Sequence, residues 1–194
     1  MAGLTTVLGG TVEIDGNDIT GLPAHVIAKK GIAYLPQTES TFTQLTVSEN
    51  LKMAGYTVEK TQYDEGLMTG LRMFPQLSNY MASKVQNLSG GERQMVAMTM
   101  ALIRKPTIIM LDEPTANLSP KLATEVLKNV GSLSQDLKMA VLLVEQNARK
   151  ALEIGDRAYL LVGGKKVFEG SAKELLEHKE LGQMYLGVKT AAAT

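Results

Sequence analysis

Two adjacent carboxylates, Asp112 and Glu113, follow the apolar run Thr107–Leu111. Such a run is typical of a buried strand, and ligands of open α/β sheets bind at the carboxyl ends of strands. At that edge Asp112 is suited to hold a magnesium ion, directly or through water, and Glu113 is suited to polarise a water molecule. The alternative is a strand that ends in a solvated acidic turn.

A second stretch whose residues suit a binding site is Ser89-Gly90-Gly91-Glu92, which matches the capping box of a helix start. We expect the helix to run to about Arg104. Gly90 and Gly91 leave the first backbone N–H groups uncovered, and such a helix N-terminus binds anions such as phosphate. The alternative is an ordinary capping box that contains two glycines.

The elements that must position these residues follow an α/β pattern. Nearly continuous apolar runs, such as Ala140–Val144, favour strands of a parallel sheet that is covered on both faces. Helical stretches lie between many of the strands. The predicted strands are Thr11–Ile14, Gly31–Leu35, Thr107–Leu111, Ala140–Glu145, Ala158–Val162 and Lys166–Phe168.

Helix starts are marked by capping residues. Residues 46–86 contain no convincing strand, so we expect a helical subdomain inserted into the α/β core. Leu22-Pro23 predicts a short helix that ends near Gly31. Further starts are predicted at the capping boxes Thr46–Glu49, Ser89–Glu92 and Ser171–Glu174 and at Ser119-Pro120.

The composition limits the class of protein. The chain has 194 residues, with 20 Lys+Arg and 20 Asp+Glu, so its formal net charge is zero and nucleic acid is not expected as a partner. Cysteine is absent, which excludes disulfides and thiolate metal sites. His25 and His178 lie far apart, no apolar run approaches the roughly 18 residues of a membrane span, and no signal peptide is visible. We therefore expect a cytoplasmic domain.

One family combines both candidate stretches. The run LSGGERQ at 88–94, followed about twenty residues later by IIMLDEPTANLSP at 108–120, resembles the ATP-binding subunits of ABC transporters. Tyr34–Gln37 resembles the Q-loop of this family, and Ala116–Ser119 occupies the place of its D-loop. Ser119 replaces the usual aspartate there, and a role as helix cap before Pro120 is the alternative.

The switch position of the family, usually a histidine, is Gln146 here. A Val-Glu-Gln-Asn-Ala segment and the run Thr11–Pro23 resemble the second ATP-binding subunit of branched-chain amino acid importers. Gln146 is able to hydrogen-bond a γ-phosphate or orient water, but it cannot carry a proton charge as histidine does.

The resemblance implies a P-loop NTPase-like fold and an ATPase that uses ATP and Mg²⁺. Asp112 would bind magnesium, Gln37 would sense magnesium and the attacking water, and Glu113 would activate that water. Gln146 would sense the γ-phosphate. The residues Ser89, Gly90, Gly91 and Glu92 would contact the ATP held by the opposite subunit of a dimer.

The resemblance also implies partners and a location. A second ABC ATPase subunit would complete the dimer, and transmembrane permease subunits would face Gln37 and the helices around 46–85. The protein would then lie peripherally on the inner face of the cell membrane. The domains that we expect are residues 1–45 (partial α/β core with the Q-loop), 46–86 (helical subdomain), 87–170 (remaining α/β core) and 171–194 (C-terminal helices and tail).

The sequence departs from the family in one respect, because no G-x-x-x-x-G-K-[ST] phosphate-binding loop is present. We expect an N-terminally truncated chain that lacks the P-loop (Walker A) strand and helix, and that is inactive by itself. Truncation is favoured because Gln37, Asp112 and Glu113 are intact. The alternatives are a non-catalytic interaction module that keeps only the donor half of the site, and a soluble ABC ATPase that acts outside transport.

Overall fold

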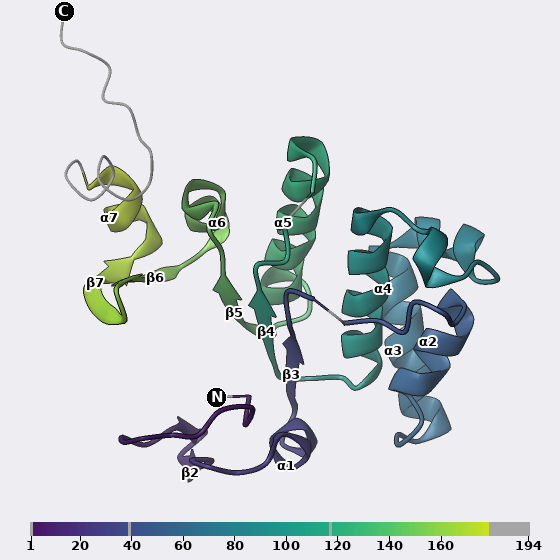
Figure 1. Cartoon of the computed structure of the whole chain (residues 1–194), viewed down its shortest axis with the longest axis horizontal. Coiled ribbons are helices and arrows are strands. Elements are labelled where there is room, and N and C mark those ends of the chain that lie inside the picture. Colours follow the sequence, from purple (N-terminus) through teal and green to yellow (C-terminus); the bar gives the residue numbers. More distant parts are fainter. Residues whose placement is uncertain (1, 39, 117, 179–194) are drawn as a thin grey trace, which may run out of the picture.

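The computed structural model describes residues 2–38, 40–116 and 118–178. The part of the predicted C-terminal helices and tail from 179 to 194 therefore lies outside the described residues, as does Asn117 of the predicted D-loop. Figure 1 shows a central sheet, a group of helices on one side of it and a separate hairpin with a short helix on the other.

The central sheet has three parallel strands in the order β3 (Ile32–Leu35), β4 (Ile108–Asp112) and β5 (Ala140–Val144). Leu35 lies beside Leu111, and Asp112 lies beside Val144. The predicted parallel α/β core is confirmed. Because the three strands point the same way, the loops that follow them meet at one edge of the sheet.

The helices begin where the capping residues predict. Thr46, Ser89 and Ser171 each form a complete capping box, and Ser119 caps its helix with Pro120 in the first turn. The α-helices are α1 (Ala24–Lys29), α2 (Val47–Ala54), α3 (Lys60–Met73), α4 (Gly90–Ile103), α5 (Pro120–Gln135), α6 (Ala148–Ile154) and α7 (Ala172–Glu177), and the 3₁₀ helices are η1 (Pro75–Tyr80) and η2 (Val85–Asn87).

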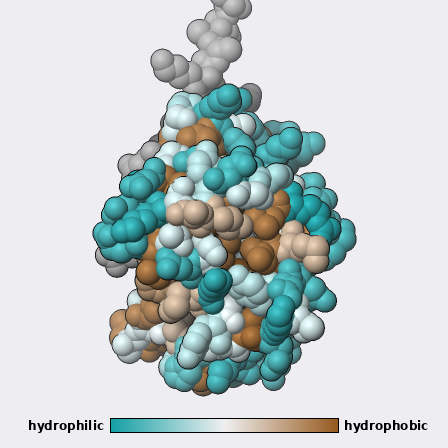
Figure 2. Space-filling model, turned by 90° about the vertical axis from the view of Figure 1, so that its right-hand side faces the viewer, coloured by the Kyte–Doolittle hydropathy of each residue, from teal (hydrophilic) through white to brown (hydrophobic). Residues whose placement is uncertain are grey.

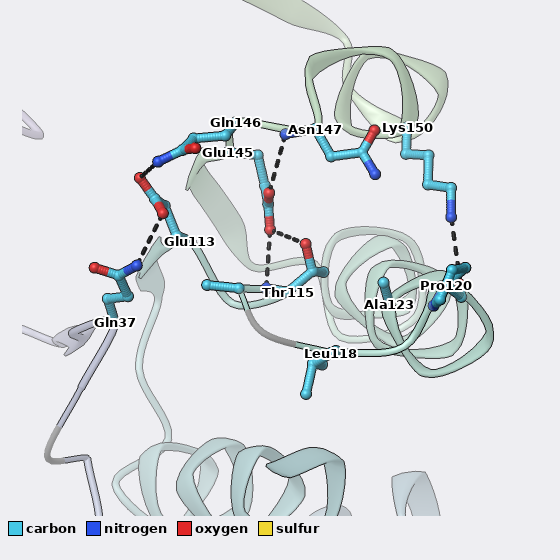
Figure 3. A pocket seen from close by; sticks show the side chains of 11 residues that line it. Gln37, Glu113, Thr115, Leu118, Pro120, Ala123, Glu145, Gln146, Asn147 and Lys150 are labelled. Carbon is cyan, nitrogen blue, oxygen red and sulfur yellow. Dashed lines mark hydrogen bonds between the residues drawn. The ribbon is translucent and has the colours of Figure 1, made fainter.

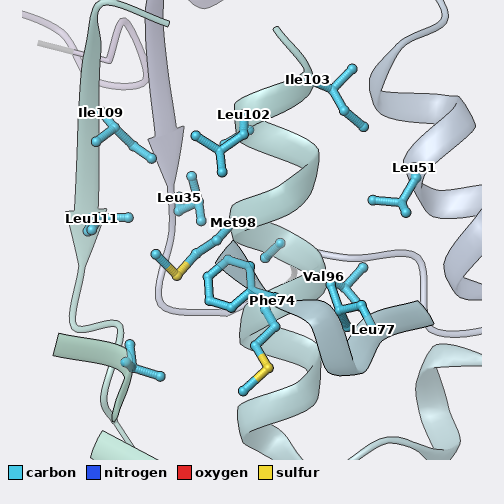
Figure 4. Packing of buried hydrophobic residues seen from close by; sticks show 14 of the residues in the cluster. Leu35, Leu51, Phe74, Leu77, Val96, Met98, Leu102, Ile103, Ile109 and Leu111 are labelled. Atoms are coloured by element: carbon cyan, nitrogen blue, oxygen red, sulfur yellow. The ribbon is translucent and has the colours of Figure 1, made fainter. Parts of the chain in front are cut away.

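The main core lies on one face of the sheet, under α4 and α5. Ile109 and Leu111 of β4 are buried there, and α4 contributes Met98 and Leu102. Figure 4 shows α4 between the strands and α2, with Phe74 packed beside Met98. Because α4 is buried along most of its length, the start of this helix has a fixed place relative to the sheet.

The opposite face of the sheet is covered only in part by the described residues. Ile32 and Met110 are buried there with Ile19 and Ile27, under α1 and the small hairpin of β1 (Glu13–Ile14) and β2 (Asn17–Asp18). On β5, however, Leu142 is 41% exposed and Val144 is 52% exposed. The expectation that this strand is covered on both faces is wrong within the described structure, because none of the described elements packs over the face that Leu142 and Val144 share.

The two ends of the helical segment that follows β3 lie side by side. The backbone N–H of Val47 donates to Ser83 at 3.0 Å, and that of Val85 donates to Leu45 at 3.0 Å. A segment whose two ends pair with each other is what an insertion requires, so the geometry is consistent with the boundaries 46–86 that the sequence suggests. α4 packs against α2 and α3 as well as β3.

The strands β6 (Arg157–Val162) and β7 (Lys165–Ser171) form an antiparallel hairpin outside the central sheet. Gly163 and Gly164 both have positive φ values, 55° and 76°, which the two-residue turn of such a hairpin requires. In the described part of the chain, no helix has the length and apolar character needed to cross a membrane.

Candidate active site

The centre of the site is the Glu113 carboxylate, directly after β4. The Gln37 amide nitrogen donates to Glu113 Oε2 at 2.9 Å, and the Gln146 amide nitrogen donates to Glu113 Oε1 at 2.7 Å. Figure 3 shows the two glutamines on opposite sides of the carboxylate. The structure thus brings together Gln37, Glu113 and Gln146, which are the three residues that the sequence proposes as catalytic.

The backbone fixes the position of this carboxylate. Glu113 has φ 45°, in the left-handed region that non-glycine residues rarely adopt, and its N–H donates to the Val144 carbonyl at 2.8 Å. Both carboxylate oxygens accept amide hydrogen bonds, so the group is held in one orientation. A carboxylate fixed at a strand end is able to accept a proton from a water molecule, which is the chemistry of a general base.

Asp112 lies beside Glu113 but has a different partner. The Tyr34 hydroxyl donates to Asp112 Oδ2 at 3.0 Å. Partial burial raises the pKa of the Tyr34 hydroxyl above its ordinary value, and the hydrogen bond to Asp112 raises it further. Sequence reasoning placed Tyr34 in the Q-loop but did not predict its contact with Asp112. Strand pairing supplies a signal for it: Tyr34 lies beside Met110, so it shares a sheet face with Asp112 two residues on.

The residues present fit a magnesium ion that keeps other ligands. Carboxylate and amide oxygens are the donors that Mg²⁺ prefers, and Asp112 and Gln37 supply one of each. Because Gln37 donates through nitrogen to Glu113, its amide oxygen remains for another partner. No cluster of three acidic or histidine side chains occurs among residues 2–38, 40–116 and 118–178, so a complete protein cage is absent there. Mg²⁺ commonly binds one or two carboxylates and completes its shell with water and phosphate oxygens.

A cavity of about 490 Å³ adjoins the cluster. Within it the Glu145 carboxylate accepts hydrogen bonds from Thr115, and the Lys150 ammonium donates to the Pro120 carbonyl at 3.3 Å (Figure 3). Sequence reasoning gave these residues no role, because side chains of loops after different strands meet only through the sheet. The lining residues are Gln37, Glu113, Thr115, Ala116, Leu118, Pro120, Ala123, Glu145, Gln146, Asn147 and Lys150.

The predicted anion site at the start of α4 has the expected cap. Ser89 N–H donates to Glu92 Oε2 at 2.7 Å, and Glu92 N–H donates to Ser89 Oγ at 3.3 Å. The hydrogen bond from the Ser89 N–H holds the pKa of the Glu92 carboxyl below its ordinary value, and a hydrogen bond from the Tyr80 hydroxyl adds to the effect.

The two glycines of this start differ in their surroundings. Gly90 is exposed, whereas Gly91 is buried, and a Cβ on Gly91 would lie 3.2 Å from the Leu122 side chain. Close packing of α5 on α4 therefore also favours a small residue at 91, since a Cβ there would displace the Leu122 side chain by a few tenths of an ångström. A second cavity of about 920 Å³ borders both Gly90 and Glu113, together with Gln37, Arg93 and Gln94. The start of α4 and the Glu113 cluster thus open onto common space.

Comparisons with known proteins agree with this geometry. Residues 1–116 match the ABC transporter family. The chain is 52% identical over 186 residues to the probable branched-chain amino acid transport ATP-binding protein LivF of Archaeoglobus fulgidus, covering 96% of this chain and 79% of that protein. It is 35% identical over 187 residues to the high-affinity branched-chain amino acid transport ATP-binding protein BraG of Pseudomonas aeruginosa, covering 96% of this chain and 80% of that protein.

A solved structure gives the same result for the fold. The ADP conformation of an ATP-binding cassette of an ABC transporter superposes with a TM-score of 0.79 at 25% identity, covering 96% of this chain and 80% of the cassette. The predicted P-loop NTPase-like fold class is thereby confirmed. On its sequence, its parallel sheet and the residues gathered at the sheet edge, the chain belongs to the ABC transporter family and has the fold of its ATP-binding cassettes.

Proposed function

We propose that this chain supplies the hydrolytic residues of the ATP-binding subunit of an importer of branched-chain amino acids. The observation that carries the proposal is the Glu113 carboxylate, which two glutamine amides hold at the carboxyl end of β4. The cargo is proposed from the two relatives, LivF and BraG, whose names specify branched-chain amino acid transport.

In this proposal the residues of the cluster divide the work of hydrolysis, and Gln37 takes part in both water positioning and magnesium binding. Glu113 accepts the proton of the water molecule that attacks the γ-phosphate of ATP. Gln37 and Gln146 hold that carboxylate in place, and their free amide oxygens orient the water. Asp112 and Gln37 hold magnesium, which when bound neutralises phosphate charge.

The start of α4 acts across a dimer in this proposal, through Ser89 and Gly90. The exposed Ser89 and Gly90 present the N-terminus of α4, where the helix dipole favours phosphate oxygens. The ATP in question is bound by a second ABC ATPase subunit. Buried Gly91 and the cap Glu92 support the shape of this helix start rather than touching the nucleotide directly.

Permease subunits are the second proposed partner, which would place the protein on the inner face of the membrane. Figure 2 looks at the side formed by the helical group and shows apolar patches among hydrophilic residues. The helical segment exposes Met53, Met68 and Tyr56, the last of them 84% exposed, and Phe42 is exposed in the preceding loop. Exposed apolar side chains of this kind favour a protein contact.

Hydrolysis of ATP tests the proposal, and the 194-residue chain by itself is the first control. It contains no G-x-x-x-x-G-K-[ST] sequence, so we propose that it neither binds Mg-ATP tightly nor hydrolyses it. The active form to be assayed carries a phosphate-binding segment of an ABC ATPase joined at the N-terminus. Phosphate release from Mg-ATP should then appear.

The Glu113→Gln variant of this joined chain should lose about a hundredfold or more of the rate while still binding Mg-ATP. The matched control is Glu125→Gln, which removes an exposed carboxylate from α5 and should hydrolyse ATP at the parent rate. Equal rates for Glu113→Gln and its parent would contradict the assignment of Glu113 as the base.

A further inference from the structure

Three consecutive residues at the end of β5, Val144, Glu145 and Gln146, tie the two loops of the site together. The Val144 carbonyl accepts the Glu113 N–H at 2.8 Å, and the Gln146 amide donates to the Glu113 carboxylate at 2.7 Å. Between these two contacts stands Glu145, whose carboxylate points the other way, toward Thr115 (Figure 3). The loop after β4 is therefore held on both sides of Glu113.

The Glu145 carboxylate uses both oxygens in these contacts. Its Oε1 accepts from the Thr115 backbone N–H at 2.9 Å and from the Thr115 hydroxyl at 2.7 Å. Its Oε2 faces the Asn147 N–H at 3.4 Å. Thr115 is only 8% exposed, so its two donors depend on this carboxylate for their partners. A carboxylate engaged in this way positions groups around it rather than reacting itself.

The backbone next to Thr115 needs such support. Glu113, two residues earlier, has φ 45°, a conformation that costs free energy for any residue with a Cβ. A strained residue keeps its conformation only where surrounding contacts fix it. The Thr115–Glu145 contacts fix the chain two residues after Glu113, and the Val144 carbonyl fixes Glu113 itself.

We propose that Glu145 is a positioning residue for the candidate active site. By holding Thr115, its carboxylate keeps Glu113 in the left-handed conformation and within reach of the Gln146 amide. The inference rests on the proposed function, in which Glu113 is the base. Its test uses no nucleotide, so its failure is distinguishable from a failure of the proposed ATPase activity.

Amide hydrogen exchange and ¹⁵N NMR of the 194-residue chain provide the test. In Glu145→Ala, exchange at the N–H groups of Glu113 and Thr115 should accelerate about tenfold, as expected for the loss of local hydrogen bonds. The side-chain NH₂ signal of Gln146 should move toward the position of a free glutamine. The matched control, Glu125→Ala, removes an exposed carboxylate from α5 and should change neither readout.

Conservative variants separate positioning from general stability. Glu145→Gln keeps an oxygen for both Thr115 donors and should retain most of the protection, and Thr115→Ser should do the same. Thr115→Val keeps the size and loses the hydroxyl, so it should give an intermediate acceleration even where Glu145→Ala folds poorly. Parent-like exchange at Glu113 in Glu145→Ala and Thr115→Val would overturn the proposal. Equal acceleration at Glu113 and in the core of α4 would also overturn it, because the effect would then be global.

Discussion

Glu113 combines a strained backbone with a fully engaged side chain. A left-handed conformation costs a residue with a Cβ about 1–2 kcal/mol, and strain of this kind concentrates at functional sites. Its carboxylate accepts two amide hydrogen bonds, and its N–H has a backbone partner. The conformation is thus maintained by contacts from β5 and from the loops after β3 and β5, which explains why the site requires the aligned strands of the sheet.

Gln146 provides the first prediction at this scale. In the chain joined to a phosphate-binding segment, Gln146→Ala should slow ATP hydrolysis about tenfold, because Glu113 loses one of its two amide donors. ATP affinity, measured by calorimetric titration, should stay close to that of the parent. Gln146→His restores a donor and should keep much of the rate. A parent-like rate for Gln146→Ala would show that the amide does not assist Glu113.

At the residue scale, motifs identify the reacting groups but not the residues that hold them. Asp112 and Glu113 stand out because two carboxylates follow an apolar run, and Gln37 and Gln146 stand out through the family pattern. The partners Tyr34, Thr115 and Glu145 lie within the family motifs, but the motifs do not show which residue each of them contacts. Their contacts span 30 to 78 positions of sequence and arise only when three strands align in register. Hydrogen bonds of this kind require tertiary structure.

At the scale of elements, α3 and α4 approach each other through glycines. A Cβ on Gly66 would lie 2.4 Å from the Ile103 Cα, and a Cβ on Gly70 would lie 2.4 Å from the Thr99 side chain. The first contact is with backbone, which cannot rotate away. The spacing of four residues places both glycines on one face of α3, and that face packs against α4.

We therefore predict that Gly66→Ala destabilises the fold by about 1–3 kcal/mol, because α3 must move away from α4. The matched control is Gly131→Ala in α5, where the new Cβ meets only Ile154 at 3.9 Å. There the gain in helix propensity should stabilise the fold by about 0.5–1 kcal/mol. Urea denaturation measures both changes. A loss for Gly66→Ala no larger than the effect at Gly131 would contradict the close packing.

The β6–β7 hairpin provides a prediction about pH. Hydrogen bonds from Lys166 and Arg157 lower the pKa of Glu169 from 4.5 to about 2. Because the folded pKa lies below the unfolded one, the ionised carboxylate contributes stability above pH 4.5, and that contribution is lost as the pH falls from 4.5 to about 2. The melting temperature of the parent should thus approach that of Glu169→Gln over this range. A constant difference between the two proteins would disprove the shift.

Local sequence signals predict most helices and strands, but they do not predict which strand faces are covered or where a strand without an apolar pattern lies. Capping boxes give the starts of α2, α4 and α7, since cap and helix are neighbours in sequence. The apolar run of β5 suggests burial on both faces, yet Leu142 and Val144 are exposed, because coverage depends on which elements lie above a strand. The small strand β2 (Asn17–Asp18) has no apolar pattern and escaped prediction.

At the scale of the whole molecule, one sheet edge connects two tasks. The loops after β3, β4 and β5 carry the proposed hydrolytic residues, and the loop after β3 leads directly into the helical segment proposed to face the permease. Gln37 contacts Glu113 and lies five residues before exposed Phe42. A change at the nucleotide is therefore able to reach the partner surface through a short stretch of chain, which is what coupling of ATP hydrolysis to transport requires.

Uptake of radiolabelled leucine tests the central claim most directly. The chain joined to a phosphate-binding segment is reconstituted in proteoliposomes with the membrane subunits of a branched-chain amino acid importer. The account predicts leucine uptake that requires Mg-ATP and disappears in Glu113→Gln, while Glu125→Gln transports as the parent does. Hydrolysis of ATP by the parent without any leucine uptake would contradict the proposed cargo, and leucine uptake that persists in Glu113→Gln would contradict the proposed chemistry.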